Sequence, residues 1–135
     1  MGVVVDTNVF IDAENGRLQL EALKPLQGEP VFLAAITMAE LLAGVHMAKT
    51  IDVRVRRRAF VENILGSAPV LDFDSEVART YSELYAQALN NKSRQRLNVH
   101  DLQIAATAIC HGHPVVTSNE DDFRWIPGVR LLKPR

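Results

Sequence analysis

The feature that most constrains the fold is a repeated pairing of short β-branched runs with stretches of helical spacing. Strands are expected at residues 3–5, 31–33, 70–71, 115–117 and 129–132. Helical patterns are expected near residues 7, 16–23, 37–45, 50–65, 74–89 and 98–111. Strands that alternate with helices predict an α/β fold, a three-layer, doubly wound, mainly parallel sheet.

Length and composition predict one domain over residues 1–135, with 47% hydrophobic and 23% charged residues. Fifteen Lys and Arg against sixteen Asp and Glu give a net charge of −1, which excludes a generally basic nucleic-acid coat. The single Cys110 excludes an internal disulfide framework and fits a reducing cytosol. No apolar run approaches the roughly 20 residues of a membrane span. We therefore expect a cytoplasmic domain with no membrane partner.

Acidic residues follow the expected strands or begin the expected helices. Asp6, Glu40, Asp101 and the segment 119–122 all occupy such positions. Right-handed crossovers place every strand-to-helix turn on one edge of a parallel sheet, where such folds bind ligands. The sequence thus predicts that these carboxylates gather at one edge.

Each acid also has a local explanation. Asp6 suits a helix N-cap, and residues 37–40 have the spacing of a capping box in which Glu40 reaches back to a backbone N–H. Asp101 would complement a helix dipole after a capping Asn98. Asn119 would cap a short last helix.

The cluster as a whole favours a cation site. Asp101 interrupts an almost wholly apolar helix that contains no Lys or Arg, and an unpaired buried carboxylate is costly. Two unit charges about 4 Å apart repel by about 4 kcal/mol at an effective dielectric constant near 20. Oxygen ligands without Cys or clustered His select Mg²⁺ or Mn²⁺ over zinc.

Four segments in order give the chain a family resemblance: VVDTN at 4–8, ITMAEL at 36–41, DLQIAATA at 101–108 and VTSNEDDF at 116–123. With these segments the sequence resembles the PIN-domain ribonucleases, most closely the VapC-type toxins of bacterial toxin–antitoxin pairs. The resemblance covers nearly the whole chain. It implies a Mg²⁺- or Mn²⁺-dependent endoribonuclease that is inhibited by a cognate antitoxin.

Carried over residue by residue, the resemblance matches Asp6, Glu40 and Asp101 to the family's three core acids. Many relatives have their fourth acid where Asn119 stands, and others have it just before the Phe, so Asn119, Asp121 and Asp122 are all candidates. We favour Asp122, with Asn119 as a polar helper.

The expected roles divide the site residues into three groups. Asp6 and Asp101 bind the metal directly, and Glu40 and Asp122 act through water. The remaining polar residues fix the carboxylate orientations: Thr7, Asn8, Thr117 and Asn119.

Two basic clusters are candidates for contacts with partners. Lys92, Arg94 and Arg96 precede Asp101 and are the better candidates for RNA phosphate contacts. Segment 49–58 holds five basic residues and one acid, a local charge of +4, which suits a solvated helix face or antitoxin docking. Apolar stripes between residues 41 and 65 exceed what a small sheet covers, which predicts an antitoxin groove there and a homodimer contact elsewhere.

The alternative from another class is a phosphoacceptor receiver-like signalling domain, which would bind Mg²⁺ through carboxylates at the same edge. A receiver needs a central strand that ends in the acceptor Asp. The residue nearest to that position is Asp52, which lies in a basic helical run with no buried strand before it.

Overall fold

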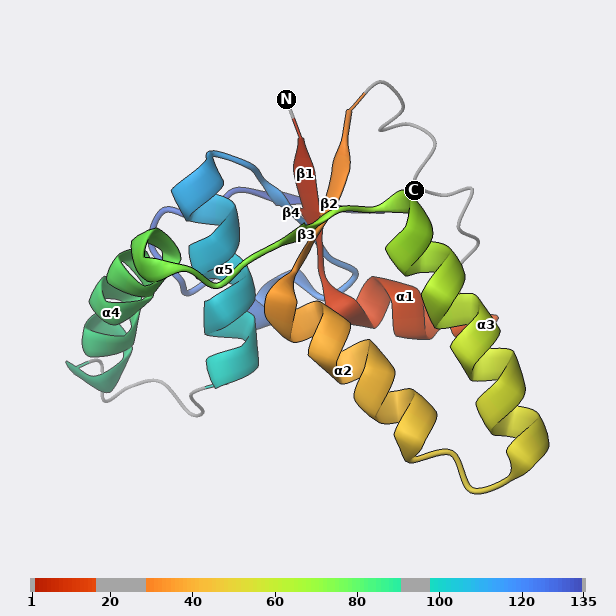
Figure 1. The fold of residues 1–135 in the computed structure, drawn as a ribbon. Helices are drawn as coiled ribbons and strands as arrows, with labels where there is room; N and C mark the ends of the chain where they lie inside the picture. Colours follow the sequence, from red (N-terminus) through yellow and green to blue (C-terminus); the bar gives the residue numbers. More distant parts are fainter. Residues whose placement is uncertain (1, 17–28, 91–97, 135) are drawn as a thin grey trace.

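The computed structural model describes residues 2–16, 29–90 and 98–134, and within them a five-stranded parallel sheet. The strand order is β3-β2-β1-β4-β5 (Figure 1). The chain therefore winds outward from β1 in one direction and later in the other, which confirms the predicted doubly wound α/β class. The strands are β1 (Val3–Val5), β2 (Val31–Ala34), β3 (Val70–Leu71), β4 (Val115–Val116) and β5 (Leu131–Leu132).

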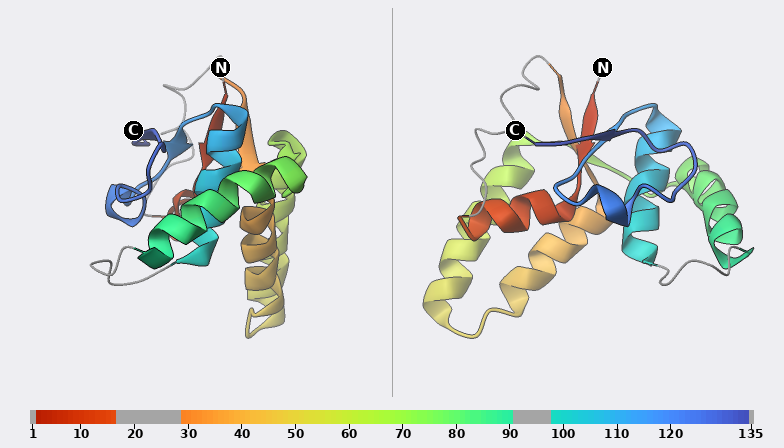
Figure 2. Two further views of the ribbon diagram at one scale, coloured as in Figure 1. Left: turned by 90° about the vertical axis from the view of Figure 1, so that its left-hand side faces the viewer. Right: turned by 180° about the vertical axis from the view of Figure 1, so that it is seen from behind.

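Helices cover both faces of the sheet, as Figures 1 and 2 show. Val3 and Val5 pack in a cluster with apolar residues of the first three helices, whereas Val4 packs with the next two. This alternation is the period of two that a strand buried on both faces requires. The helices are α1 (Thr7–Glu14), α2 (Ala35–His46), α3 (Ile51–Ser67), α4 (Ser75–Asn90) and α5 (Val99–His111), with a short 3₁₀ helix, η2 (Glu120–Asp122).

Side-chain and glycine caps fix several helix ends. The Thr50 hydroxyl accepts a hydrogen bond from the Val53 N–H at 3.1 Å at the start of α3. Gly112 ends α5 in the left-handed conformation, with φ +74°, as its position after the helical pattern predicts.

One predicted helix begins at a different residue in the structure, and another lies mostly outside the described residues. Helix α2 begins at Ala35 rather than at Thr37, so the predicted capping box at residues 37–40 is wrong. Thr37 lies inside the helix, and its hydroxyl contacts Thr7 instead of a free backbone N–H. Most of the helix expected at 16–23 lies outside the described residues.

No helix within residues 2–16, 29–90 and 98–134 is long and apolar enough to cross a bilayer.

The end of α5 yields a test of the fold. Gly112→Ala should destabilise the protein by about 1 kcal/mol, because an alanine disfavours the left-handed conformation although there is space for its Cβ. Gly66→Ala is the matched control, since Gly66 also has open space around it but lies within α3. The control should be neutral or stabilising by up to about 1 kcal/mol. Urea unfolding measures both, and equal effects of the two substitutions would contradict the assigned cap.

Candidate active site

The candidate site lies where the winding of the sheet reverses, between β1 and β4. Asp6 directly follows β1 and Thr117 directly follows β4. The Thr117 hydroxyl donates to Asp6 Oδ2 at 2.9 Å, and the Asp6 N–H donates to the Val116 carbonyl at 2.8 Å. Crevices at such reversal points are where open α/β sheets bind ligands.

Asp6 is a buried carboxyl group, with 1% of the residue exposed. It occupies the N-cap position of α1, where its side chain forms no geometrically complete capping hydrogen bond, although the nearby Asn8 N–H interacts with its carboxylate. Burial raises the pKa of Asp6 to about 6. The Thr117 hydroxyl and the nearby Asn8 N–H oppose this pKa shift, while the charges of Glu40 and Asp122 add to it.

Asp101 is the second buried carboxyl group, in the first turn of α5. The predicted Asn98 cap is present: its Oδ1 accepts from the N–H groups of His100 at 3.0 Å and of Asp101 at 3.2 Å. That cap orients the helix start but leaves the Asp101 carboxylate buried. Burial, followed by the charges of Asp6, Asp122 and Glu40, raises the pKa of Asp101 to about 7.

Glu40 reaches the same place from α2 and is held at both carboxylate oxygens. Oε1 accepts from the Thr7 hydroxyl at 2.7 Å, and Oε2 lies 2.9 Å from His100 Nδ1. The predicted role of Thr7 in orienting a carboxylate is therefore matched by its geometry. His100 is the residue that sequence analysis missed, although its place next to Asp101 at the start of α5 was a signal for it.

The segment after β4 distinguishes the candidates for the fourth acid. Asp122 raises the pKa of both Asp6 and Asp101, so its charge faces the pair. Asp121 is ion-paired with Arg124. Asn119 is exposed, makes no side-chain cap for η2, and donates its backbone N–H to the Thr117 hydroxyl at 3.0 Å. Of the three candidates, Asp122 is the one whose charge acts on the buried pair, so it remains the favoured fourth acid.

One sequence-based expectation differs from the described site, and another falls on residues outside it. Asn8 is exposed, and the group it offers to Asp6 is its backbone N–H rather than its side chain. Lys92, Arg94 and Arg96, the predicted RNA contacts, lie outside the described residues.

The donor set suits a hard divalent cation. Four carboxylates interact through their charges, and the two most buried ones have raised pKa values, so a bound cation would relieve both repulsion and desolvation. Among the described residues, no group of three or more His, Cys, Asp or Glu side chains is arranged to hold a metal ion. Mg²⁺ usually takes one or two protein carboxylates and keeps several waters, so Asp6 and Asp101 fit that requirement.

Comparison with known proteins agrees with this geometry. Residues 3–128 match the model of the PIN domain. The chain belongs to the PIN-domain family. Its relatives include Ribonuclease VapC1 of Rickettsia felis, 33% identical over 134 residues that cover 98% of this chain and 96% of the relative. Ribonuclease VapC5 of Mycobacterium tuberculosis is 38% identical over 130 residues, covering 96% and 91% of the two chains.

Several solved structures similar to this PIN domain are VapBC complexes. The DNA-bound VapBC of Salmonella typhimurium superposes with a TM-score of 0.87 at 25% identity, covering 100% of this chain and 99% of the other. VapBC2 of Rickettsia felis, bound to a promoter DNA fragment, gives 0.85 at 26% identity and covers 98% of each chain. The resemblance to PIN-domain ribonucleases of the VapC type is therefore confirmed.

The receiver-like alternative fails on the same structure. Asp52, its required phosphoacceptor, lies in the first turn of α3 rather than at the end of a strand. Asp52 is also exposed, whereas Asp6 and Asp101 are buried.

The raised pKa values predict a pH dependence of stability. Because both folded-state pKa values exceed 3.8, the metal-free folded protein binds more protons than the unfolded chain between about pH 4 and pH 7. Its free energy of unfolding should fall as pH rises through that range. Asp101→Asn should reduce this slope and stabilise the protein above pH 7 by on the order of 2 kcal/mol.

Thermal unfolding in EDTA across this pH range measures the slope. Asp72→Asn is the control, because Asp72 is exposed after β3 and should leave the slope unchanged. A loss of stability in Asp101→Asn at every pH would contradict the account.

Proposed function

We propose that this protein is a Mg²⁺- or Mn²⁺-dependent endoribonuclease, the toxin of a toxin–antitoxin pair. The observation that carries the proposal is the pair of buried carboxyl groups with raised pKa values, Asp6 and Asp101, at the reversal point of a VapC-type PIN fold. Such a pair is costly unless a cation binds it.

In this proposal each acid has a distinct task. Asp6 and Asp101 hold the cation, which when bound lowers the pKa of a coordinated water and offsets negative charge on the phosphate. Glu40, held by Thr7 and His100, orients the attacking water and accepts its proton. Asp122 adds negative charge near Asp6 and Asp101 and acts through water. Hydrolysis of this kind leaves a 5′-phosphate and a 3′-hydroxyl.

RNA needs positive charge beside the site. Lys92, Arg94 and Arg96 remain the proposed phosphate contacts because they precede Asp101 in sequence. Among the described residues, Lys133 follows β5 at the same edge of the sheet and lines a polar pocket with Ser118 and Asn119.

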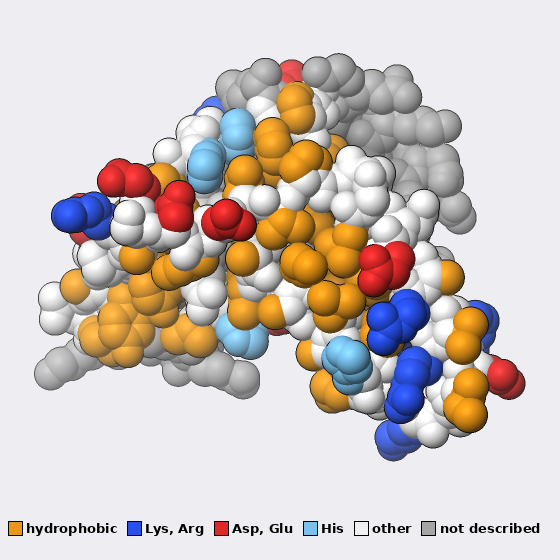
Figure 3. Space-filling model, in the orientation of Figure 1, with side chains coloured by type: hydrophobic (Ala, Val, Ile, Leu, Met, Phe, Trp, Pro, Cys, Tyr) orange, Lys and Arg blue, Asp and Glu red, His pale blue; other side chains and the backbone are white. Residues whose placement is uncertain are grey.

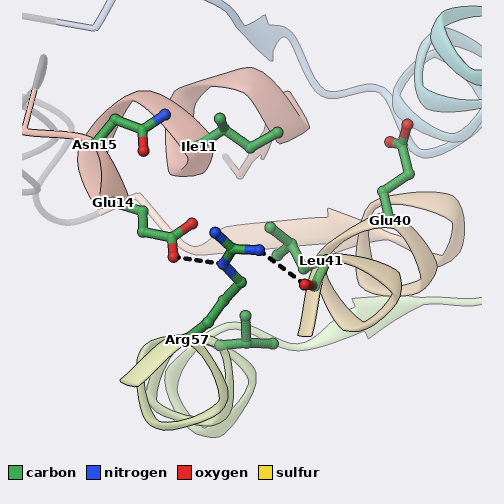
Figure 4. A pocket seen from close by; sticks show the side chains of 8 residues that line it. Ile11, Glu14, Asn15, Glu40, Leu41 and Arg57 are labelled. Atoms are coloured by element: carbon green, nitrogen blue, oxygen red, sulfur yellow. Dashed lines mark hydrogen bonds and ion pairs between the residues drawn. The ribbon is translucent and has the colours of Figure 1, made fainter. Parts of the chain in front are cut away.

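We propose that the antitoxin binds in the groove among α1, α2 and α3, as the apolar stripes predict. A pocket of about 190 Å³ lies there, and Ile11, Leu41 and Val61 supply its apolar lining. In Figure 4, Arg57 reaches across it, donating to Glu14 Oε2 at 2.8 Å and to the Gly44 carbonyl at 2.9 Å. The same pocket extends to Glu40, so an occupant would sit next to the catalytic edge.

Surface charge supports this placement. Lys and Arg side chains gather over the ends of α2 and α3 in Figure 3, where Met47, Ile51 and Val55 are also exposed. A surface that combines exposed apolar and basic residues suits an acidic, amphipathic segment.

A homodimer contact is proposed on the other side of the sheet. Exposed aromatic and aliphatic residues gather over α4, where Figure 3 shows an apolar patch. Exposed apolar residues of α4 and of the segment just before it include Phe73, Tyr85 and Leu89. Leu89→Arg should convert a dimer into a monomer in light scattering, and an unchanged mass would place the contact elsewhere.

Cleavage of RNA tests the enzymatic proposal. Purified protein should cut RNA with Mg²⁺ or Mn²⁺ and not with EDTA, and should leave 5′-phosphates. Asp6→Asn and Asp101→Asn should each abolish the cut, because each removes a proposed metal ligand. Glu83→Gln, an exposed change in α4, is the control and should cut normally. Cleavage that persists in EDTA or in either Asn variant would reject the proposal.

Antitoxin binding has its own test. Ile11→Glu should weaken co-purification with the antitoxin while metal-dependent cleavage persists, because it places a charge in the groove. Leu132→Glu is a matched control, since Leu132 and Ile11 are each 38% exposed but Leu132 lies on β5, the last strand in the order β3-β2-β1-β4-β5, and does not line the groove. If both variants co-purify equally well with the antitoxin, the antitoxin binds outside this groove.

A further inference from the structure

We propose that His100 is a positioning residue, which holds the Glu40 carboxylate at the catalytic edge through its Nδ1 and completes a hydrogen-bonded chain from Thr37 through Thr7. This inference rests on the proposed function, because it assumes that Glu40 orients the attacking water. It assigns a task to a histidine that is not among the site residues expected from the sequence.

The direction of each hydrogen bond follows from counting protons. Thr7 Oγ1 lies 2.9 Å from Thr37 Oγ1 and 2.7 Å from Glu40 Oε1, but a hydroxyl carries a single proton. An ionised carboxylate only accepts, so Thr7 donates to Glu40 and accepts from Thr37. Thr37 is fully buried, so its proton has no competing water. The Thr37 hydroxyl therefore orients the Thr7 hydroxyl, which donates its proton to Glu40 Oε1.

His100 supplies the donor for the other oxygen. Its Nδ1 lies 2.9 Å from Glu40 Oε2, so the neutral ring must carry its proton on Nδ1 to make this bond. The backbone of His100 is held in place, because Asn98 Oδ1 accepts a hydrogen bond from its N–H at the start of α5. The same cap accepts from the Asp101 N–H, which ties the histidine to the buried acid beside it.

Glu40 needs two anchors because like charges surround it. Its charge raises the pKa of both Asp6 and Asp101, which means that these groups repel its carboxylate in turn. A glutamate side chain is long and loses rotamer freedom when it is held in one place. With 30% of the side chain exposed, Glu40 has a path toward solvent. The donors from α1 and α5 oppose that movement.

The basic residue in the neighbouring groove does not replace these anchors. Arg57 lines the same pocket as Glu40 but is bound to Glu14 and to the Gly44 carbonyl. Figure 4 shows the Glu40 carboxylate directed away from Arg57. His100 Nδ1 is thus the hydrogen-bonding partner that the structure shows for Glu40 Oε2.

Three substitutions separate positioning from direct action on RNA. In His100→Asn the amide nitrogen takes the place of Nδ1, whereas in His100→Gln it takes the place of Nε2, and His100→Ala removes both. We expect His100→Asn to cleave RNA within about threefold of the wild type. His100→Ala and His100→Gln should lose roughly tenfold or more in kcat with KM unchanged, as expected for outer partners of a metal site.

The opposite pattern would overturn the inference. If His100→Gln is active and His100→Asn is not, Nε2 acts directly on the substrate. If all three variants cleave as the wild type does, or if only KM changes, His100 does not position Glu40. If the wild type itself does not cleave RNA, the proposed function is rejected instead. A second measurement then still tests the contact between His100 and Glu40.

The second readout needs neither metal nor RNA. Correlation of imidazole proton and nitrogen shifts by NMR, in EDTA under alkaline conditions, reports which ring nitrogen carries the proton. We expect the Nδ1–H tautomer for His100 in the wild type and a return to Nε2–H in Glu40→Ala. An Nε2–H tautomer in the wild type would contradict the bond to Glu40, whatever the cleavage assay shows.

Discussion

The structure depends on a conflict between burial and charge at the reversal point of the sheet. Asp6 and Asp101 come from opposite ends of the sequence, and the fold removes both from water beside two further acids. Without a cation this arrangement opposes folding, because each carboxylate loses hydration and faces like charges. The apolar clusters on the two faces of the sheet supply the stability that lets the conflict persist.

Local hydrogen bonds then determine where each carboxylate lies. The Thr117 hydroxyl holds Asp6, the Asn98 cap sets the start of the helix that carries Asp101, and Thr7 and His100 hold Glu40. Each anchor comes from a different segment at the same edge of the sheet. The catalytic edge is therefore a property of the topology, and short polar side chains refine it.

Much of this was predictable from the sequence because the signals are local. The β-branched runs gave the strands, and the position of Gly112 gave the end of α5. The start of α2 was misjudged, because Thr37 and Glu40 have capping-box spacing but use their side chains for contacts with α1 and α5. The His100–Glu40 contact joins residues 60 positions apart, which no local pattern reveals.

Calorimetric titration of Mg²⁺ and Mn²⁺ into the metal-free protein tests the central claim most directly. If the buried acids form one cation site, binding should release protons at about pH 6 and release far fewer at about pH 8.5, because the two carboxyls are then already ionised. Asp6→Asn and Asp101→Asn should each abolish binding. Metal binding that persists in either variant, or that releases no protons at the lower pH, would contradict the account.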